Sequence, residues 1–230
     1  MRIAGLQPLS LLDFPGRVAA VVFTQGCPFR CVYCHNPELI APQGKNVLET
    51  EDVLDRIGER KLFLDGVVVT GGEPTVHHDL PEFLSELKSM GLETKLDTNG
   101  VHPRMIERII QEGLADFFAM DLKHVWRDYG SVIGTAARAA TENCIETMRI
   151  IRSSGIASEF RTTVYPYLQT EDDLVEIAEN LGTDDCYVLQ EIRYEKTLQT
   201  HLPRAPNLDL NAVAERIRAS KPGLRVEIRA

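Results

Sequence analysis

The sequence predicts an α/β fold, an incomplete parallel (β/α)6 barrel (a partial TIM barrel) with an N-terminal extension. The first reason is a repeating pattern: after about residue 45, apolar β-type runs alternate with amphipathic segments, several of which end in glycine. The second is length. A complete eight-unit barrel takes about 250 residues, whereas this chain has 230, enough for six strand–helix units and an extension. An open doubly wound sheet is the competing arrangement.

The expected strands are seven short runs rich in β-branched and apolar residues. They cover residues 18–24, 67–70, 94–97, 117–121, 159–164, 187–190 and 225–228. Apolar residues at i, i+3, i+4 and i+7 predict helices over 80–87, 174–181 and 210–217. Alternating strands and helices favour parallel pairing with right-handed crossovers. Residues 1–17 lie outside this rhythm and predict a hairpin or extra strands, while residues 18–230 predict the barrel, so that 1–230 forms a single domain.

Composition and charge exclude several classes of protein. The chain is 43% hydrophobic and 26% charged, as in ordinary globular proteins, with 34 acidic against 25 basic residues and a net charge of −9. An acidic chain is unsuited to general nucleic-acid binding, which requires a basic face. No apolar run approaches the ~20 residues of a membrane helix, and the N-terminus lacks the apolar core of a signal peptide. We therefore expect a cytoplasmic protein with reduced thiols, no nucleic-acid partner and no membrane association.

The most informative residues are Cys27, Cys31 and Cys34, which lie in one short glycine- and proline-flanked segment. An odd total of five cysteines in a reducing compartment favours metal binding over disulfides. A zinc site needs four ligands, and the nearest fourth, His35, directly follows Cys34, where tetrahedral ligation is awkward. A four-iron cluster with three thiolates would keep one iron open for a reactant. The iron–sulfur interpretation is therefore favoured, and the remaining two cysteines are expected in the core.

Polar residues follow the expected strands at the ends that a parallel barrel would bring to one mouth. Alone, each such motif is common in turns or surface ion pairs. Their succession after the cysteine segment instead predicts one site. The residues are Gly71, Gly72 and Glu73 after the second run, Asp97 and Thr98 after the third, Asp121 and Lys123 after the fourth, and Gln190 after the sixth.

The cysteine spacing C-x3-C-x2-C, with Tyr33 just before the last cysteine and Gly-Gly-Glu further on, resembles the radical S-adenosylmethionine superfamily. More narrowly, the segments 13–17 (Asp-Phe-Pro-Gly-Arg) and 23–37 are similar to those of glycyl-radical-enzyme activating proteins. The nearest likeness is to activators of anaerobic ribonucleoside-triphosphate reductase, followed by pyruvate formate-lyase activators. The resemblance runs from residue 1 to about residue 165.

This resemblance implies a [4Fe–4S] cluster held by Cys27, Cys31 and Cys34, with S-adenosylmethionine chelating the open iron. It also implies a set of contacts to that cofactor. Tyr33 and the backbone through Cys34 and His35 would pack on the adenine. The amino group would be received by Gly71, Gly72 and Glu73. A monovalent cation beside the carboxylate would be held by Asp97, Thr98 and Asp121, and Lys123 would contact the methionine end. Gln190 would stand where pyruvate formate-lyase activators carry a histidine.

The implied activity is that of an oxidoreductase. It would cleave S-adenosylmethionine reductively and take a hydrogen atom from a glycine Cα of a partner glycyl radical enzyme, with anaerobic ribonucleotide reductase as the expected partner. A reduced flavodoxin or ferredoxin would supply the electron. Three alternatives remain open: a pyruvate formate-lyase-type activator, a radical enzyme of the same superfamily that acts on a small molecule or peptide, and a zinc-stabilised binding module without catalysis.

Overall fold

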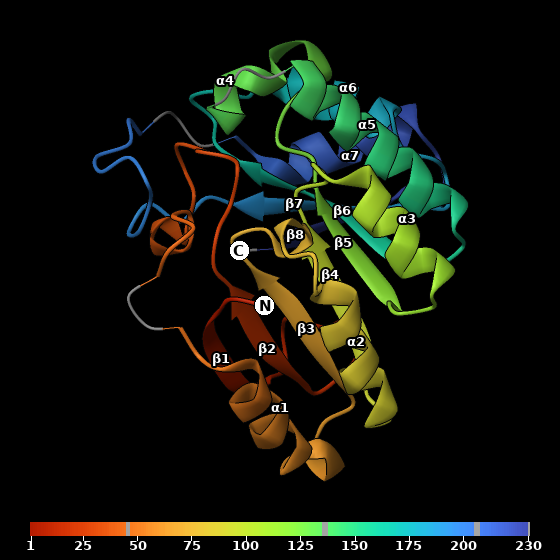
Figure 1. Cartoon of the computed structure of the whole chain (residues 1–230). Helices are drawn as coiled ribbons and strands as arrows, with labels where there is room; N and C mark the ends of the chain where they lie inside the picture. The colour runs from red at the N-terminus through yellow and green to blue at the C-terminus, as the bar shows by residue number, and fades with distance from the viewer. Residues whose placement is uncertain (45–46, 135–137, 205–207, 230) are drawn as a thin grey trace. The chain divides into compact units, whose positions relative to one another are not determined.

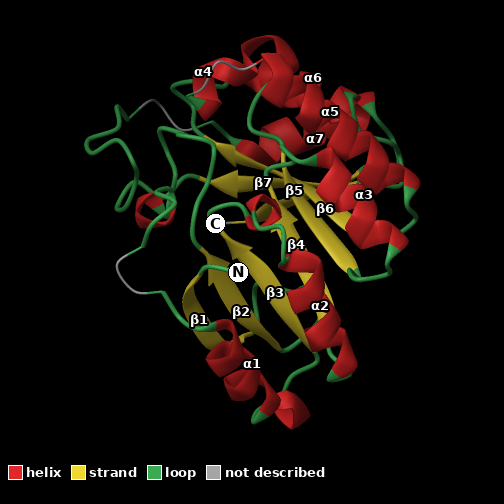
Figure 2. Ribbon diagram, viewed as in Figure 1, coloured by secondary structure: helices red, strands yellow, loops and turns green. Residues whose placement is uncertain are grey.

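The structure is a computed structural model, and it describes residues 1–44, 47–134, 138–204 and 208–229. It confirms the α/β class, with strands and helices that alternate along the chain (Figures 1 and 2). The strands are β1 (Ile3–Ser10), β2 (Ala19–Thr24), β3 (Gly66–Gly71), β4 (Glu93–Thr98), β5 (Phe117–Asp121), β6 (Ala157–Val164), β7 (Cys186–Glu191) and β8 (Arg225–Arg229). The α-helices are α1 (Thr50–Gly58), α2 (Leu80–Ser89), α3 (Pro103–Gln111), α4 (Tyr129–Ile133), α5 (Arg138–Ser153), α6 (Glu171–Glu179) and α7 (Leu210–Ser220).

The strand order matches the barrel-type prediction. The strands succeed one another in chain order, β1 to β8, without the reversal that marks the switch point of a doubly wound sheet. The pairs β2–β3, β3–β4, β6–β7 and β7–β8 are parallel. The N-terminal extension is one added strand, because β1 pairs antiparallel with β2. Each strand from β2 to β7 is followed by a helix, which gives the six expected units before β8.

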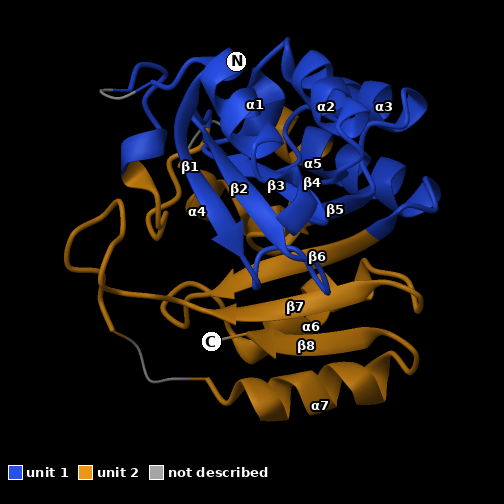
Figure 3. Cartoon of the chain, turned by 90° about the horizontal axis from the view of Figure 1, so that it is seen from below, with its two compact units in different colours: residues 1–28, 38–119, 143–157 blue, residues 29–37, 120–142, 158–230 orange. Residues whose placement is uncertain are grey.

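The chain divides into two compact units that interleave along the sequence (Figure 3). Unit 1 comprises Met1–Pro28, Glu38–Ala119 and Asn143–Ala157, and unit 2 comprises Phe29–Pro37, Met120–Glu142 and Ser158–Ala230. Unit 1 therefore contains β1 to β4 with α1 to α3, while unit 2 contains β6 to β8 with α6 and α7. The single domain expected from the sequence stays a prediction.

Each unit has an apolar interior of its own. In unit 1, Phe14, Ala19, Val21 and Val68 form a buried cluster, and Phe14 packs on the ring of Phe117 with centroids 5.9 Å apart. In unit 2, α6 packs on α7, and α7 packs on β8, since both helices present apolar residues at helical spacing. Within the described ranges, no helix combines the length and apolar character needed to cross a membrane.

Candidate functional site

The residues that the sequence singled out form two groups, one in each compact unit. Unit 1 contains Cys27, Gly71, Gly72, Glu73, Asp97 and Thr98, and unit 2 contains Cys31, Tyr33, Cys34, His35, Asp121, Lys123 and Gln190. None of the five cysteines forms a disulfide bond. Among the residues that the structure describes, no three His, Cys, Asp or Glu side chains already converge as metal ligands do.

Two glycines at the end of β3, Gly71 as its last residue and Gly72 directly after it, are required by close packing of backbone on backbone. Gly71 has a φ of +118°, and a Cβ there would lie 2.3 Å from the Thr24 nitrogen. A Cβ on Gly72 would lie 2.2 Å from the carbonyl oxygen of Gly26. Backbone bonds reinforce this approach: Gly72 N donates to Thr24 O at 2.9 Å, and Glu73 N donates to Gly26 O at 2.8 Å. The close neighbours that exclude a side chain here are the end of β2 and the loop that carries Cys27. The contact of these glycines with the cofactor stays a prediction.

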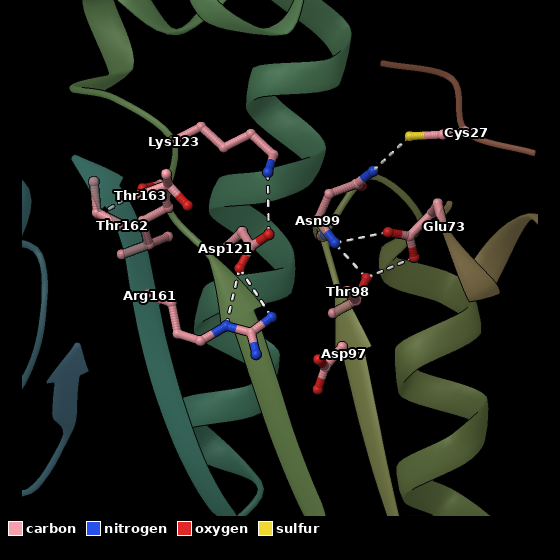
Figure 4. Close-up of polar contacts among 12 residues, drawn as sticks. Cys27, Glu73, Asp97, Thr98, Asn99, Asp121, Lys123, Arg161, Thr162 and Thr163 are labelled. Atoms are coloured by element: carbon pink, nitrogen blue, oxygen red, sulfur yellow. Dashed lines mark hydrogen bonds and ion pairs between the residues drawn. The ribbon is translucent and has the colours of Figure 1, made fainter. Parts of the chain in front are cut away.

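The Glu73 carboxylate is engaged by donors of the protein itself (Figure 4). Its Oε1 accepts from Thr98 Oγ1 at 2.7 Å, from Thr75 Oγ1 at 2.5 Å and from Thr75 N at 3.2 Å, while Oε2 accepts from Asn99 N at 2.7 Å. The side chain is 1% exposed. Burial raises the pKa of the Glu73 carboxyl, although the donors from Asn99, Thr75 and Thr98 favour the ionised form. The side chain thus ties the loop after β3 to the loop after β4.

Asn99 was missed as a site residue by the sequence reasoning. Its Nδ2 lies 3.7 Å from Cys27 Sγ and donates to it (Figure 4), while its Oδ1 accepts from Val101 N at 3.0 Å. The Asn99 carbonyl accepts from Cys144 Sγ at 3.2 Å, so backbone and side chain are both fixed. An N–H donor favours the thiolate form of a neighbouring cysteine, and hydrogen bonds to sulfur tune iron–sulfur centres. The available signal was the Asn-Gly pair that directly follows the expected strand end at Asp97 and Thr98, a pair that is also common in tight turns.

Asp97 is paired with a buried lysine that the sequence analysis did not single out. Lys95 Nζ lies 2.5 Å from Asp97 Oδ1, and Thr70 Oγ1 donates to Asp97 Oδ2 at 3.3 Å. The Lys95 side chain is 1% exposed and lies over the Phe117 ring, 5.9 Å from its centroid. Lys95 and Asp97 are two positions apart in β4, so their side chains share one face of the strand. The sequence did contain a signal for this pair: a lysine two residues before an aspartate, in a strand flanked by apolar strands.

In unit 2, the segment with the other two predicted ligands is fixed by backbone contacts. Cys34 N donates to Cys31 O at 2.9 Å, and Cys34 O accepts from Leu198 N at 3.0 Å. His35 Nε2 accepts from Arg193 N at 3.2 Å. Cys31 is 6% exposed. Burial raises the pKa of the Cys31 thiol, so a bound metal ion or nearby positive charge must favour its thiolate.

Tyr33 belongs to an aromatic cluster in unit 2. Its ring meets that of Tyr165 edge-on, with centroids 6.2 Å apart and an interplanar angle of 71°, and Tyr165 stacks on Tyr167 at 5.8 Å. The Tyr33 hydroxyl donates to the Lys123 carbonyl at 3.5 Å. Burial raises the pKa of Tyr33 well above its usual value, which keeps the phenol neutral. The adenine contact predicted for Tyr33 stays a prediction, and the sequence analysis missed Tyr165 and Tyr167.

Asp121 is held between two cationic side chains of unit 2 (Figure 4). Lys123 Nζ lies 3.1 Å from its Oδ2, and Arg161 Nε donates to its Oδ1 at 3.0 Å. Burial alone would raise the pKa of Asp121, but the charges of Lys123 and Arg161 outweigh burial and lower it to about 2. The Asp121 charge in turn raises the pKa of Lys123 against the effect of burial. Arg161 falls within the expected strand 159–164, but the sequence analysis gave it no role.

Arg161→Met is expected to move acid unfolding to higher pH. Because the pKa of Asp121 is lower in the folded state, about 2, than its unfolded value near 3.9, this carboxylate stabilises the fold above about pH 4 and loses that effect as pH falls toward about 2. The side chain is 32% exposed, so the contribution is discounted for solvent to on the order of 1 kcal/mol. Acid titration followed by circular dichroism and by the single tryptophan, Trp126, measures the midpoint.

Arg216→Met is the matched control for this prediction. Arg216 is 48% exposed and pairs with Glu171 and Asp172 at the surface, where ion pairs contribute little to stability. The control is expected to keep the midpoint of the unchanged protein. Equal midpoints in the two variants would show that Arg161 does not hold the ionised form of Asp121.

Gln190 lies in β7, half-buried and aligned with Thr163 of β6 and Arg229 of β8. Its predicted contact to the cofactor stays a prediction. The two cysteines expected in the core are both buried: Cys144 lies in α5, and Cys186 begins β7.

The chain is similar to proteins of a known family. Residues 21–181 match the Radical SAM superfamily, more than half of the chain. A Methanocaldococcus jannaschii protein named "Putative glycyl-radical enzyme activating enzyme" is 29% identical over 216 residues, 93% of this chain and 89% of that protein. The pyruvate formate-lyase-activating enzyme of Clostridium pasteurianum is 31% identical over 176 residues, 73% of this chain and 70% of that enzyme.

Solved structures show the same fold. Streptococcus suis SuiB bound to the precursor peptide SuiA superposes with a TM-score of 0.73 at 15% identity over 91% of this chain, which spans about half (48%) of that protein. Escherichia coli QueE gives a TM-score of 0.62 at 17% identity over 100% of this chain and 93% of that one. These likenesses concern the fold alone. The family match and the curated relatives show that the chain belongs to the radical SAM superfamily, among its glycyl-radical enzyme activating enzymes.

Proposed function

We propose that this chain reductively cleaves S-adenosylmethionine and takes a hydrogen atom from a glycine Cα of a partner glycyl radical enzyme, with anaerobic ribonucleoside-triphosphate reductase as the partner. The observation that carries the proposal is the fixed surroundings of Cys27. Its loop is hydrogen-bonded to the glycine loop after β3, and the side-chain amide of Asn99 donates to its sulfur at 3.7 Å. The backbone N–H of Asn99 donates to Glu73 Oε2, which fixes the residue in place.

The residues present fit an iron–sulfur cluster with three protein ligands. None of Cys27, Cys31 and Cys34 is committed to a disulfide bond, and thiolates are the usual ligands of such clusters. Asn99 supplies a hydrogen bond to one ligand sulfur, and Lys123 supplies a positive charge that lowers the pKa of the Cys31 thiol against the effect of burial. When bound, the cluster and S-adenosylmethionine supply the electron transfer and the hydrogen-atom abstraction.

The chain's own residues would bind and orient the cofactor. Lys123, with its ammonium already oriented by Asp121, would contact the methionine carboxylate. Main-chain groups of Gly71 to Glu73 would receive the amino group, while the Glu73 carboxylate holds the loop in place rather than contacting the cofactor. Tyr33, with the backbone through Cys34 and His35, would pack on the adenine, and Gln190 would replace the histidine of pyruvate formate-lyase activators.

The proposal is tested by electron paramagnetic resonance on candidate partners. The protein is reconstituted anaerobically with iron and sulfide, reduced by a flavodoxin or ferredoxin system, and mixed with S-adenosylmethionine and either an anaerobic ribonucleotide reductase or a pyruvate formate-lyase. We expect a glycyl-radical doublet on the reductase and none when S-adenosylmethionine is omitted.

Other outcomes would contradict the proposal in distinct ways. A doublet on pyruvate formate-lyase alone would establish that alternative, which the 31% identity to the Clostridium pasteurianum enzyme favours. Cofactor cleavage without a radical on either partner would indicate a small-molecule or peptide substrate. A colourless protein that binds zinc and no iron would leave only a binding module.

A further inference from the structure

We propose that Lys95 is a built-in counter-cation for Asp97, so that this chain binds S-adenosylmethionine without a free monovalent cation. The resemblance to pyruvate formate-lyase activators implies such a cation at Asp97, Thr98 and Asp121, but the side chains around these carboxylates do not suit one. The functional consequence rests on the proposed cofactor site, whereas the ion pair itself can be tested without the cofactor.

The contacts of Asp97 leave little for an added ion to bind. Lys95 Nζ lies 2.5 Å from Oδ1, and Thr70 Oγ1 donates to Oδ2 at 3.3 Å. The Thr98 hydroxyl, another expected ligand, donates to Glu73 Oε1 at 2.7 Å and accepts from Gly100 N at 3.0 Å, so one of its lone pairs is already engaged. An alkali ion needs several oxygen ligands around it, and at Asp97 it would meet an ammonium group instead.

Burial fixes the ammonium in this position. The Lys95 side chain is 1% exposed, and Asp97 is 14% exposed. A buried ammonium is costly unless it is paired, and Lys95 has Asp97 as its ion partner and the face of Phe117 as a further favourable contact. Moving Lys95 away to admit an alkali ion would leave its charge unpaired inside unit 1.

The charges around Asp97 and Asp121 also argue against an added cation at either carboxylate. In unit 1, Lys95 at +1 and Asp97 at −1 sum to zero. In unit 2, Asp121 pairs with both Lys123 and Arg161. Arg161 also lies 3.8 Å from Glu159, which itself pairs with Arg229. Hard cations are commonly bound by carboxylate oxygens, and both Asp97 and Asp121 are already paired with cationic side chains. The structure therefore assigns the counter-charge to the protein's own side chains.

The test compares salts of matched ionic strength on the full chain. Thermal unfolding and equilibrium binding of S-adenosylmethionine are measured anaerobically in potassium chloride, sodium chloride and choline chloride. We expect the midpoint temperature and the Kd of the unchanged protein to be the same in all three. A saturable, potassium-specific tightening of binding by about tenfold or more, or a potassium-specific rise in midpoint, would overturn the proposal.

The Lys95→Met variant is the one that we expect to respond to potassium. Methionine keeps an unbranched apolar chain but removes the charge, which leaves the Asp97 carboxylate uncompensated, so potassium is expected to raise the midpoint temperature of this variant and to tighten its cofactor binding. Lys88→Met is the matched control, because Lys88 pairs with Asp116 in the same unit, where the two side chains are 32% and 33% exposed rather than enclosed. It should remain insensitive to the choice of cation.

Two further comparisons keep the result decisive. If Lys95→Met folds poorly, the double variant Lys95→Met with Asp97→Asn removes both charges and is expected to regain stability without gaining a potassium effect. A Lys95→Met protein that folds well and ignores potassium would contradict the proposal. A failure of every variant to bind S-adenosylmethionine would count against the proposed function, while the unfolding data would still decide the role of Lys95.

Discussion

Cys31→Ala is expected to abolish cluster assembly and cleavage of S-adenosylmethionine. Two thiolates cannot retain a four-iron cluster that needs at least three, so activity should fall by more than about 100-fold, beyond the range typical for loss of an outer-shell partner. Iron and sulfide content, visible absorbance and 5′-deoxyadenosine formation after anaerobic reconstitution provide the measurement.

Cys186→Ala is the matched control for this loss. Both cysteines are buried in unit 2, Cys31 at 6% and Cys186 at 2% exposure, so both changes remove a buried sulfur of similar size. The control should retain iron, sulfide and cleavage. Near-normal turnover in Cys31→Ala, or equal loss in the two variants, would refute the assignment of Cys31 as a ligand.

Gly72→Ala is expected to show the second large effect, on folding and on the cysteine loop together. The new Cβ would lie 2.2 Å from the Gly26 carbonyl oxygen and 2.8 Å from that of Leu39. Because both obstacles are backbone atoms, the strain cannot be relieved by turning a side chain, and the free energy of unfolding should fall by about 3 kcal/mol. Chemical denaturation measures this loss, and iron content after reconstitution should fall with it, since Gly26 precedes the ligand Cys27.

Gly58→Ala separates steric clash from the general effect of adding a methyl group. A Cβ at Gly58, the last residue of α1, would meet no atom within 4 Å. Alanine favours helix over glycine by up to about 1 kcal/mol, so this control should be neutral or more stable than the unchanged protein. Equal stability of the two alanine variants would contradict the role given to Gly72.

Much of the fold could be predicted because its signals are local. The runs at 117–121 and 159–164 coincide with β5 and most of β6, since a buried parallel strand is a short apolar or β-branched run between turns. The helix expected over 80–87 lies inside α2 for the same kind of reason, because its apolar residues repeat at helical spacing. The division into two interleaved units was not predicted, as it depends on contacts between segments far apart in the chain.

The candidate site was predicted in composition but not in its pairings. Glu73 was assigned to the cofactor, but its carboxylate accepts four hydrogen bonds from Thr75, Thr98 and Asn99. The sequence gives no measure of how many donors will surround a carboxylate that follows a strand. Lys95 was missed for a related reason, since burial, which the sequence does not report, distinguishes an internal ion pair from an exposed one.

The three cysteines show which properties of the site follow from the sequence and which depend on the tertiary structure. Their residue types and spacing are chemical facts of the chain, and they alone indicated an iron–sulfur cluster, because thiolates bind iron in any fold that presents them. What surrounds them depends on the tertiary structure: the Asn99 amide at Cys27, the charge of Lys123 acting on Cys31, and the ammonium of Lys95 at Asp97. Hydrogen bonds and charge effects of this kind fall off over a few ångströms. Which residues become neighbours therefore depends on folding. Cys31 and Lys123, for example, lie 92 positions apart in the sequence.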